Sequence, residues 1–118
     1  MRVFLNPYLV IFPVALFLQG CKIEIAVPEG GKVITASGDH RCLSGDCVIE
    51  VSDFEFSQQF IAEPHEGYTF AGWEERWRGL CGGSRKPCKL STRGHDDNEV
   101  ISAMVASDEI FYLTPVFY

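Results

Sequence analysis

Five cysteines are the residues of this chain whose type and spacing most directly indicate chemistry. Cys21 follows an apolar N-terminal run, whereas the other four form two close pairs, Cys42 with Cys47 and Cys81 with Cys88. Once Cys21 is set aside the number is even, as in a disulfide framework, and three pairings are formally possible. We favour the two local pairings because each short interval contains glycine, which lets the chain turn back on itself.

A four-cysteine zinc site is the competing interpretation of the same side chains. The intervals between them, 4, 33 and 6 residues, are looser than those of zinc ribbons and fingers. Zinc also needs thiolates, which an oxidising compartment removes. We therefore expect two disulfides, no metal site and no cofactor.

Residues 1–20 have the shape of a secretory signal peptide. Arg2 is their only charge, and the apolar run 3–18 is interrupted by two prolines and an asparagine. That run is shorter than the roughly 20 apolar residues that a membrane-spanning helix needs. The pattern therefore favours a signal peptide over a permanent membrane span.

The end of this segment, Leu18-Gln19-Gly20-Cys21, resembles the bacterial lipobox, in which the cysteine is acylated on sulfur and becomes the mature N-terminus. Gln19 departs from the small or aliphatic residue usual there, and a plain signal peptide that ends near a cysteine is the alternative. Lys22 in place of aspartate resembles lipoproteins that are sorted to the outer membrane. We therefore expect a signal peptide over 1–20, one exported domain over 21–118 and a lipid anchor on Cys21, on the periplasmic or the surface face of the outer membrane.

No set of residues indicates catalysis. The three histidines, His40, His65 and His95, lie beside acids in expected turns, and no short spacing brings them together as metal ligands. The acidic run 96–99 lacks the alternation of a calcium loop. The chain has no nucleophile elbow, and a domain of this size leaves little room for the pocket that a glycosidase carboxylate pair would need.

The segment from Arg76 to Arg93 holds six of the ten basic residues and no acid, in a chain of net charge −6. A solvated loop whose arginines pair with nearby acids is one interpretation. A basic patch for an anionic glycan, a lipid or an acidic protein surface is the other. Trp77 either is exposed, and could then stack on a sugar ring or a protein, or packs over the nearby disulfide. The candidate binding residues are Arg76, Trp77, Arg78, Arg85 and Lys86.

Short strands are expected to position these residues. Residues 22–27 alternate apolar and polar side chains, and residues 32–37 and 47–51 are rich in β-branched ones. Residues 28–31 have turn composition, so the first two strands are predicted to form a hairpin. A second hairpin is predicted around the turn 64–67, with the extended arms 56–63 and 68–73 and with Trp73 in the core.

One helix is predicted over residues 97–106, with Asp96 or Asp97 as its N-cap. Its single apolar stripe comprises Val100, Ile101, Met104 and Val105. Residues 110–118 predict a final apolar strand. Because Pro115 lacks a backbone donor, this strand is expected to lie at a sheet edge or to bend there.

Several of these segments together resemble a known family. They are a Gly-Lys-Val-Ile-Thr turn into the second strand, Ala62-Glu63-Pro64, the run from Glu66 to Trp73, the two cysteine pairs and the closing Pro115-Val116-Phe117. They are similar to divergent internalin-B-type β-repeats of bacterial surface and secreted proteins. The resemblance covers Ile23 to Phe117, although residues 91–109 are longer than in the plain repeat and a single copy stands behind the lipobox.

The resemblance implies a β-grasp-like fold, a small mixed sheet with one short crossover element. Together with the predicted strands, helix and cysteine pairs, we expect an α+β, mainly β fold with one short helix and two short-range disulfides. It also implies a surface role and transfers no catalytic residue. With 47% hydrophobic and 22% charged residues, the composition is that of one ordinary globular domain. We expect a non-enzymatic envelope lipoprotein module that binds an envelope protein or glycan and no nucleic acid. A small envelope enzyme, or an enzyme inhibitor, acting on glycan or peptide is the alternative.

Overall fold

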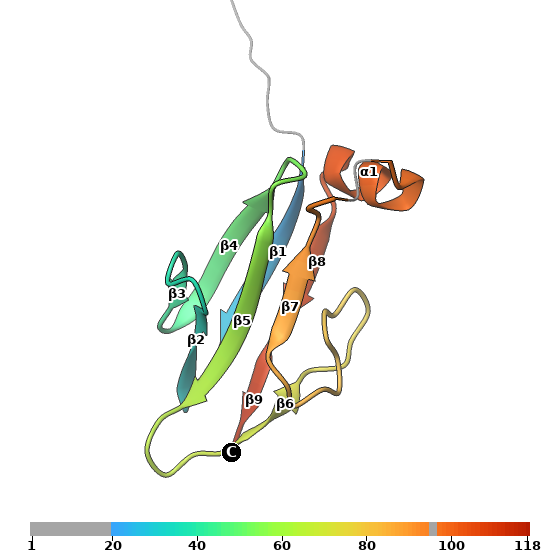
Figure 1. Ribbon diagram of the computed structural model, residues 1–118. Helices are drawn as coiled ribbons and strands as arrows, with labels where there is room; N and C mark the ends of the chain where they lie inside the picture. The colour runs from blue at the N-terminus through green and yellow to red at the C-terminus, as the bar shows by residue number, and fades with distance from the viewer. Residues whose placement is uncertain (1–19, 95–96) are drawn as a thin grey trace, which may run out of the picture.

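The computed structural model describes residues 20–94 and 97–118. The expected signal peptide therefore lies outside the described residues except for Gly20. Within these ranges the chain forms nine strands and one helix (Figure 1). In chain order they are β1 (Cys21–Val27), β2 (Gly31–Thr35), β3 (Arg41–Cys42), β4 (Gly45–Val51), β5 (Ser57–Pro64), β6 (Phe70–Trp73), β7 (Cys88–Ser91), α1 (Glu99–Ala106), β8 (Ile110–Leu113) and β9 (Pro115–Phe117).

The central strand of a mixed sheet is β1, which pairs antiparallel with β4 and parallel with β8. An antiparallel sheet has the order β3-β2-β5-β7, and β6 pairs with β9 in a short third sheet. Alternate side chains of β1 are buried, as its sequence pattern predicts. The most buried core side chains include Ile25, Val33, Phe60 and Leu113. The predicted class, α+β and mainly β with one short helix and two local disulfides, is confirmed.

The first predicted hairpin is wrong, because β1 and β2 belong to different sheets. The turn between them exists, but the chain crosses there from one sheet to the other. Both strands bury alternate side chains, and Ile25 of β1 and Val33 of β2 belong to the same core. Strands that face each other across a core bury more apolar surface than a two-stranded hairpin does alone.

The second predicted hairpin is also wrong. The turn is present, since the Tyr68 amide donates to the His65 carbonyl at 3.0 Å. However, β5 pairs with β2 and β7, whereas β6 pairs with β9. Thr69 and Tyr118 exchange backbone hydrogen bonds of 2.7 and 3.0 Å, which commit this arm to the C-terminal strand. Trp73 is buried as expected.

The predicted final strand is divided at Thr114. Its first part, β8, continues the mixed sheet beside β1, and its second part, β9, pairs with β6. Pro115 is fully buried and lies opposite Trp73 in that pairing. Both parts are edge strands of their sheets, so the expected edge position is confirmed.

The helix α1 begins later than expected, at Glu99. Its N-cap is Asn98, whose Oδ1 accepts hydrogen bonds from the amides of Val100 at 2.9 Å and Ile101 at 3.1 Å. The predicted cap at Asp97 is wrong, and Asp96 lies outside the described residues. The apolar stripe is only partly confirmed, because Val105 is buried whereas the side chain of Val100 is 68% exposed.

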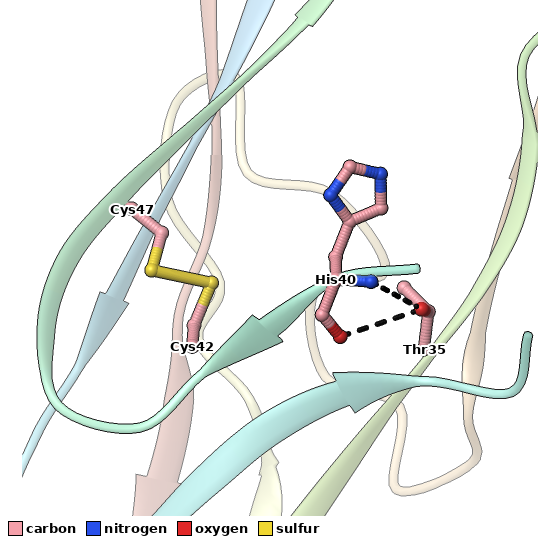
Figure 2. The surroundings of a disulfide bond; sticks show 4 residues. All are labelled: Thr35, His40, Cys42 and Cys47. Carbon is pink, nitrogen blue, oxygen red and sulfur yellow. Dashed lines mark hydrogen bonds between the residues drawn. A yellow bond between two sulfur atoms is a disulfide. The ribbon is translucent and has the colours of Figure 1, made fainter. Parts of the chain in front are cut away.

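The disulfide Cys42–Cys47 ties β3 to β4, with its Cα atoms 6.0 Å apart (Figure 2). The loop before it is held by the buried Thr35, whose hydroxyl accepts from the His40 amide at 3.0 Å and donates to the His40 carbonyl at 3.4 Å (Figure 2). The second disulfide, Cys81–Cys88, has a Cα separation of 5.8 Å. Both predicted pairings are therefore confirmed, and the four sulfurs are not available as zinc ligands.

Candidate binding surface

Residues Arg76 to Gly79 form a tight turn, which we call the Trp77 turn. The Gly79 amide donates to the Arg76 carbonyl at 2.8 Å, so Trp77 and Arg78 occupy the two central positions. Arg78 has a φ of 59°, and a positive φ at the second central residue alone is characteristic of a type II turn. Gly79 is needed for a different reason, since an added Cβ would lie 2.9 Å from the Arg76 carbonyl oxygen.

The Trp77 turn is fastened to the edge of the mixed sheet. The Tyr112 amide in β8 donates to the Arg78 carbonyl at 2.9 Å, and the Tyr112 carbonyl accepts from the Leu80 amide at 2.7 Å. The Arg76 guanidinium also lies 3.8 Å from the centre of the Tyr112 ring. Hydrogen bonds from the backbone amide and to the backbone carbonyl of Tyr112 therefore hold the turn. This support makes the turn more rigid than an isolated loop.

Trp77 itself points outward. Its side chain is 75% exposed, the largest exposed fraction among the large hydrophobic residues of the described ranges. Packing over the disulfide, one of the two interpretations of Trp77, is therefore wrong. The Arg78 guanidinium lies 4.4 Å from the indole centre and 5.7 Å from that of Phe111, so one face of the indole is supported by a cation.

Both arginines of the turn have an acidic neighbour. Arg76 Nη1 lies 3.8 Å from Glu74 Oε1, and Arg78 Nη2 lies 3.4 Å from Glu109 Oε1. Exposed ion pairs of this kind contribute little to stability. They do reduce the local positive charge, so the turn is less basic than the composition of the segment predicts.

Arg85 and Lys86 lie in a different structure, the loop closed by Cys81–Cys88. This loop is tied to β6, since the Lys86 carbonyl accepts from the Trp73 indole at 2.8 Å and Arg85 Nε donates to the Ala71 carbonyl at 3.3 Å. Within residues 20–94 and 97–118, neither cation takes part in an ion pair. The five candidate binding residues are therefore divided between one turn and one loop.

Cys21, the predicted lipidation site, begins β1 with its side chain in the core. Its Sγ is 3.8 Å from the Val51 carbonyl oxygen, and the residue is buried. Burial raises the pKa of this thiol, because a thiolate would lose its hydration there. Cys21 is also the free cysteine that remains after the two disulfides are formed.

Metal binding has no support in the part of the chain that the structure describes. No three His, Cys, Asp or Glu side chains there are grouped so that they could hold an ion. His40 and His65 lie in separate loops, and His95 lies outside the described residues.

An open polar groove of about 520 Å³ is lined by several acids, among them Asp39, Asp53 and Glu55.

No family model, no curated protein and no solved structure matches this chain. Among the described residues, no helix has the length and apolar character needed to cross a membrane.

The partners of the Trp77 turn, Tyr112 and Glu109, were not among the sequence-predicted site residues. The sequence contains no local signal for them, because Glu109 and Tyr112 lie 31 and 34 positions beyond Arg78.

Proposed function

We propose that this chain is a non-enzymatic module of the bacterial cell envelope, which binds an envelope protein or glycan through the Trp77 turn. The observation that carries the proposal is the 75% exposure of Trp77 on a turn that hydrogen bonds hold to β8. Exposed tryptophans contribute strongly to binding when a partner covers them. A turn that is already ordered loses little conformational entropy on binding.

The indole is the main determinant of this interaction. Arg76 and Arg78 are paired with Glu74 and Glu109, so the turn offers an aromatic face with little net charge. Arg85 and Lys86 supply positive charge from the neighbouring disulfide loop and would steer a partner of opposite sign. A pyranose ring or an apolar protein side chain would stack on the indole.

Export is supported by the two disulfides, which persist in oxidising compartments. Anchoring is supported by the sequence that ends at Cys21, and the outer membrane is favoured by Lys22. Family membership, as a single-copy relative of the internalin-B-type repeat with a β-grasp-like sheet, rests on the sequence resemblance of the run from Glu66 to Trp73 and of the closing Pro115-Val116-Phe117.

The buried position of Cys21 imposes an order of events on this proposal. Acyl transfer requires an exposed thiol, whereas Cys21 Sγ faces the core once β1 pairs with β4. Acylation therefore precedes the completion of this pairing. The acylated residue then stays outside the core, and the pairing of β1 begins at Lys22.

Acyl labelling tests the anchor. The wild-type chain, expressed in bacteria that are fed a labelled fatty acid, should carry the label and sediment with membranes. Cys21→Ser should lose the label and leave the membrane fraction. A wild-type chain without label, or a Cys21→Ser chain that keeps it, would contradict acylation at Cys21.

The binding test compares two exposed aromatic residues. Full-length wild-type chain, Trp77→Ala and the control Tyr118→Ala are immobilised and exposed to an envelope extract. Tyr118 is 71% exposed, lies 41 positions beyond Trp77 in the sequence and pairs through its backbone with Thr69 and not with the Trp77 turn. Retention of envelope material by wild type and Tyr118→Ala, but not by Trp77→Ala, is the expected result.

A further inference from the structure

An apolar cavity lies between α1 and the mixed sheet. Its volume is about 200 Å³, and it is partly open to solvent. Cys21 and Ile23 of β1, Phe111 of β8, and Ile101, Met104 and Val105 of α1 contribute to its wall. In Figure 1, α1 lies at the end of the sheet where β1 and β8 begin. We call this space the helix cavity.

Among the described residues, those that line the helix cavity carry no charged side chain. Of the side-chain polar groups in the described lining, one is the Cys21 thiol and the others belong to Ser91 and Thr92. The Thr92 hydroxyl already donates to the Asp53 carbonyl at 2.9 Å. Water is poorly held in such a space, because an ordered water needs two or more polar partners. A cavity left empty forfeits the dispersion contacts of its lining. The helix cavity is therefore suited to an apolar ligand.

The size of the helix cavity limits that ligand. An apolar cavity of about 150 Å³ is large enough for benzene. By that comparison the helix cavity takes roughly six to eight carbon atoms. It can therefore hold a segment of one hydrocarbon chain but not two chains side by side. Met104 is a flexible and polarisable wall residue that can follow the shape of a chain.

The polar groove described above indicates the head group. It shares Val51 and Phe56 with the helix cavity, so the two spaces adjoin. Four acids line the groove, Asp39, Glu50, Asp53 and Glu55, against the single cation Arg93. Arg93 is further engaged, because its Nη2 donates to the Glu55 carbonyl at 3.0 Å. A negatively charged head group would be repelled there, whereas a neutral or positive one would not.

We propose that the helix cavity binds the hydrocarbon chain of a single-chain amphiphile whose head group is uncharged or positively charged and lies in the adjoining acidic groove. This site is separate from the Trp77 turn. It does not depend on the proposed partner binding, so either can fail without the other. Because Cys21 lines the cavity, the proposal is made for the chain with an unmodified Cys21 thiol.

The structure provides a direct reporter for the test. The sequence has two methionines, Met1 and Met104, and Met104 lines the helix cavity. Full-length chain is made by cell-free synthesis without membranes, so that Cys21 stays unmodified, and is labelled with ¹³C at the methionine methyl groups. Normal alcohols from butanol to decanol are titrated while the Met104 methyl signal is followed by NMR.

The Met104 signal should shift, and each added methylene should tighten the dissociation constant about fourfold. This gain should end at roughly six to eight carbons, where the cavity is full. Octylamine should bind at least as tightly as octanol, and octanoate several-fold more weakly. An unmoved Met104 signal, a gain that continues through decanol, or octanoate binding as tight as octanol binding would overturn the proposal.

Two variants with opposite effects provide a further check. Ile101→Phe fills the cavity and should abolish the shift with octanol, whereas the control Val100→Phe, on the exposed side of α1, should leave it unchanged. Leu90→Ala enlarges the cavity and should move the limiting chain length upward. If Ile101→Phe fails to fold, Leu90→Ala still decides the matter, because an unchanged limit would contradict chain binding in this cavity.

Discussion

The guanidinium of Arg76 stacks on the ring of Tyr112 at 3.8 Å, and this contact joins the first residue of the Trp77 turn to the strand β8. The backbone of Tyr112 holds the same turn through Arg78 and Leu80. One strand residue therefore positions the turn by its ring and by both of its backbone groups. This arrangement explains how a short surface turn can present a large indole in one orientation.

Arg76→Ala should loosen the turn without unfolding the domain. The lost cation–π contact at an exposed site is worth about 0.5–1 kcal/mol. Urea unfolding should show a loss of that size, and hydrogen exchange of the Gly79 and Leu80 amides should become faster. Lys89→Ala, which removes an exposed cation from β7, serves as the control and should change neither. An equal loss of stability and equally fast exchange in Lys89→Ala would contradict the claim that the Arg76–Tyr112 contact stabilises the turn.

Each disulfide should contribute on the order of 2–3 kcal/mol to stability in the chain-entropy model. The contribution is at this level and not higher because each bridge closes only a short loop. Peptide mapping without reduction should link Cys42 to Cys47 and Cys81 to Cys88. Paired serine substitutions at either bridge should lower the free energy of unfolding in urea by about that amount. Free thiols at these positions, or links between the two pairs, would contradict the structure.

The unmodified Cys21 thiol should make stability depend on alkaline pH. Burial raises its pKa in the folded protein above the ordinary value of 9.0, so the folded state retains the proton that the unfolded chain loses. The contribution is fully present below pH 9.0 and is lost as the pH rises through the folded-state value. Urea unfolding between pH 8 and 10.5 of cell-free protein should therefore show a steeper loss for wild type than for Cys21→Ala. Parallel curves for the two proteins would show that the thiol is not buried.

Local features of the fold could be predicted from the sequence, whereas strand pairing could not. The alternation in 22–27, the turn before Tyr68 and the edge position of the strand at Pro115 depend on neighbouring residues, and each is present. Both predicted hairpins are wrong because β1 pairs with β4 and β8 and not with β2, and β5 pairs with β2 and β7 and not with β6. These pairings join the strands into sheets around one core, which a local sequence pattern does not specify. The cap at Asn98 was missed because adjacent Asp, Asp and Asn residues compete for the same role.

For the candidate binding surface, too, local features could be predicted from the sequence whereas contacts between distant residues could not. The exposure of Trp77 was one of two interpretations of the sequence, because a tryptophan between two arginines lies outside any apolar pattern. The pairing of Arg76 and Arg78 with Glu74 and Glu109 reduced the predicted basic patch. Of these acids, Glu109 is thirty-one residues beyond Arg78, and only the folded sheet brings them together.

Trp77→Ala gives the most direct test of the central claim, that the Trp77 turn is the binding contact. Because Trp77 is exposed and loses only its cation–π contact with Arg78, its replacement should change the free energy of unfolding by no more than about 1 kcal/mol. Retention of envelope material by the immobilised chain, quantified for wild type, Trp77→Ala and Tyr118→Ala at low and high salt, is the deciding measurement. The account predicts loss of retention in Trp77→Ala alone, with modest salt dependence because both arginines of the turn are paired. Equal retention by all three folded proteins would contradict it.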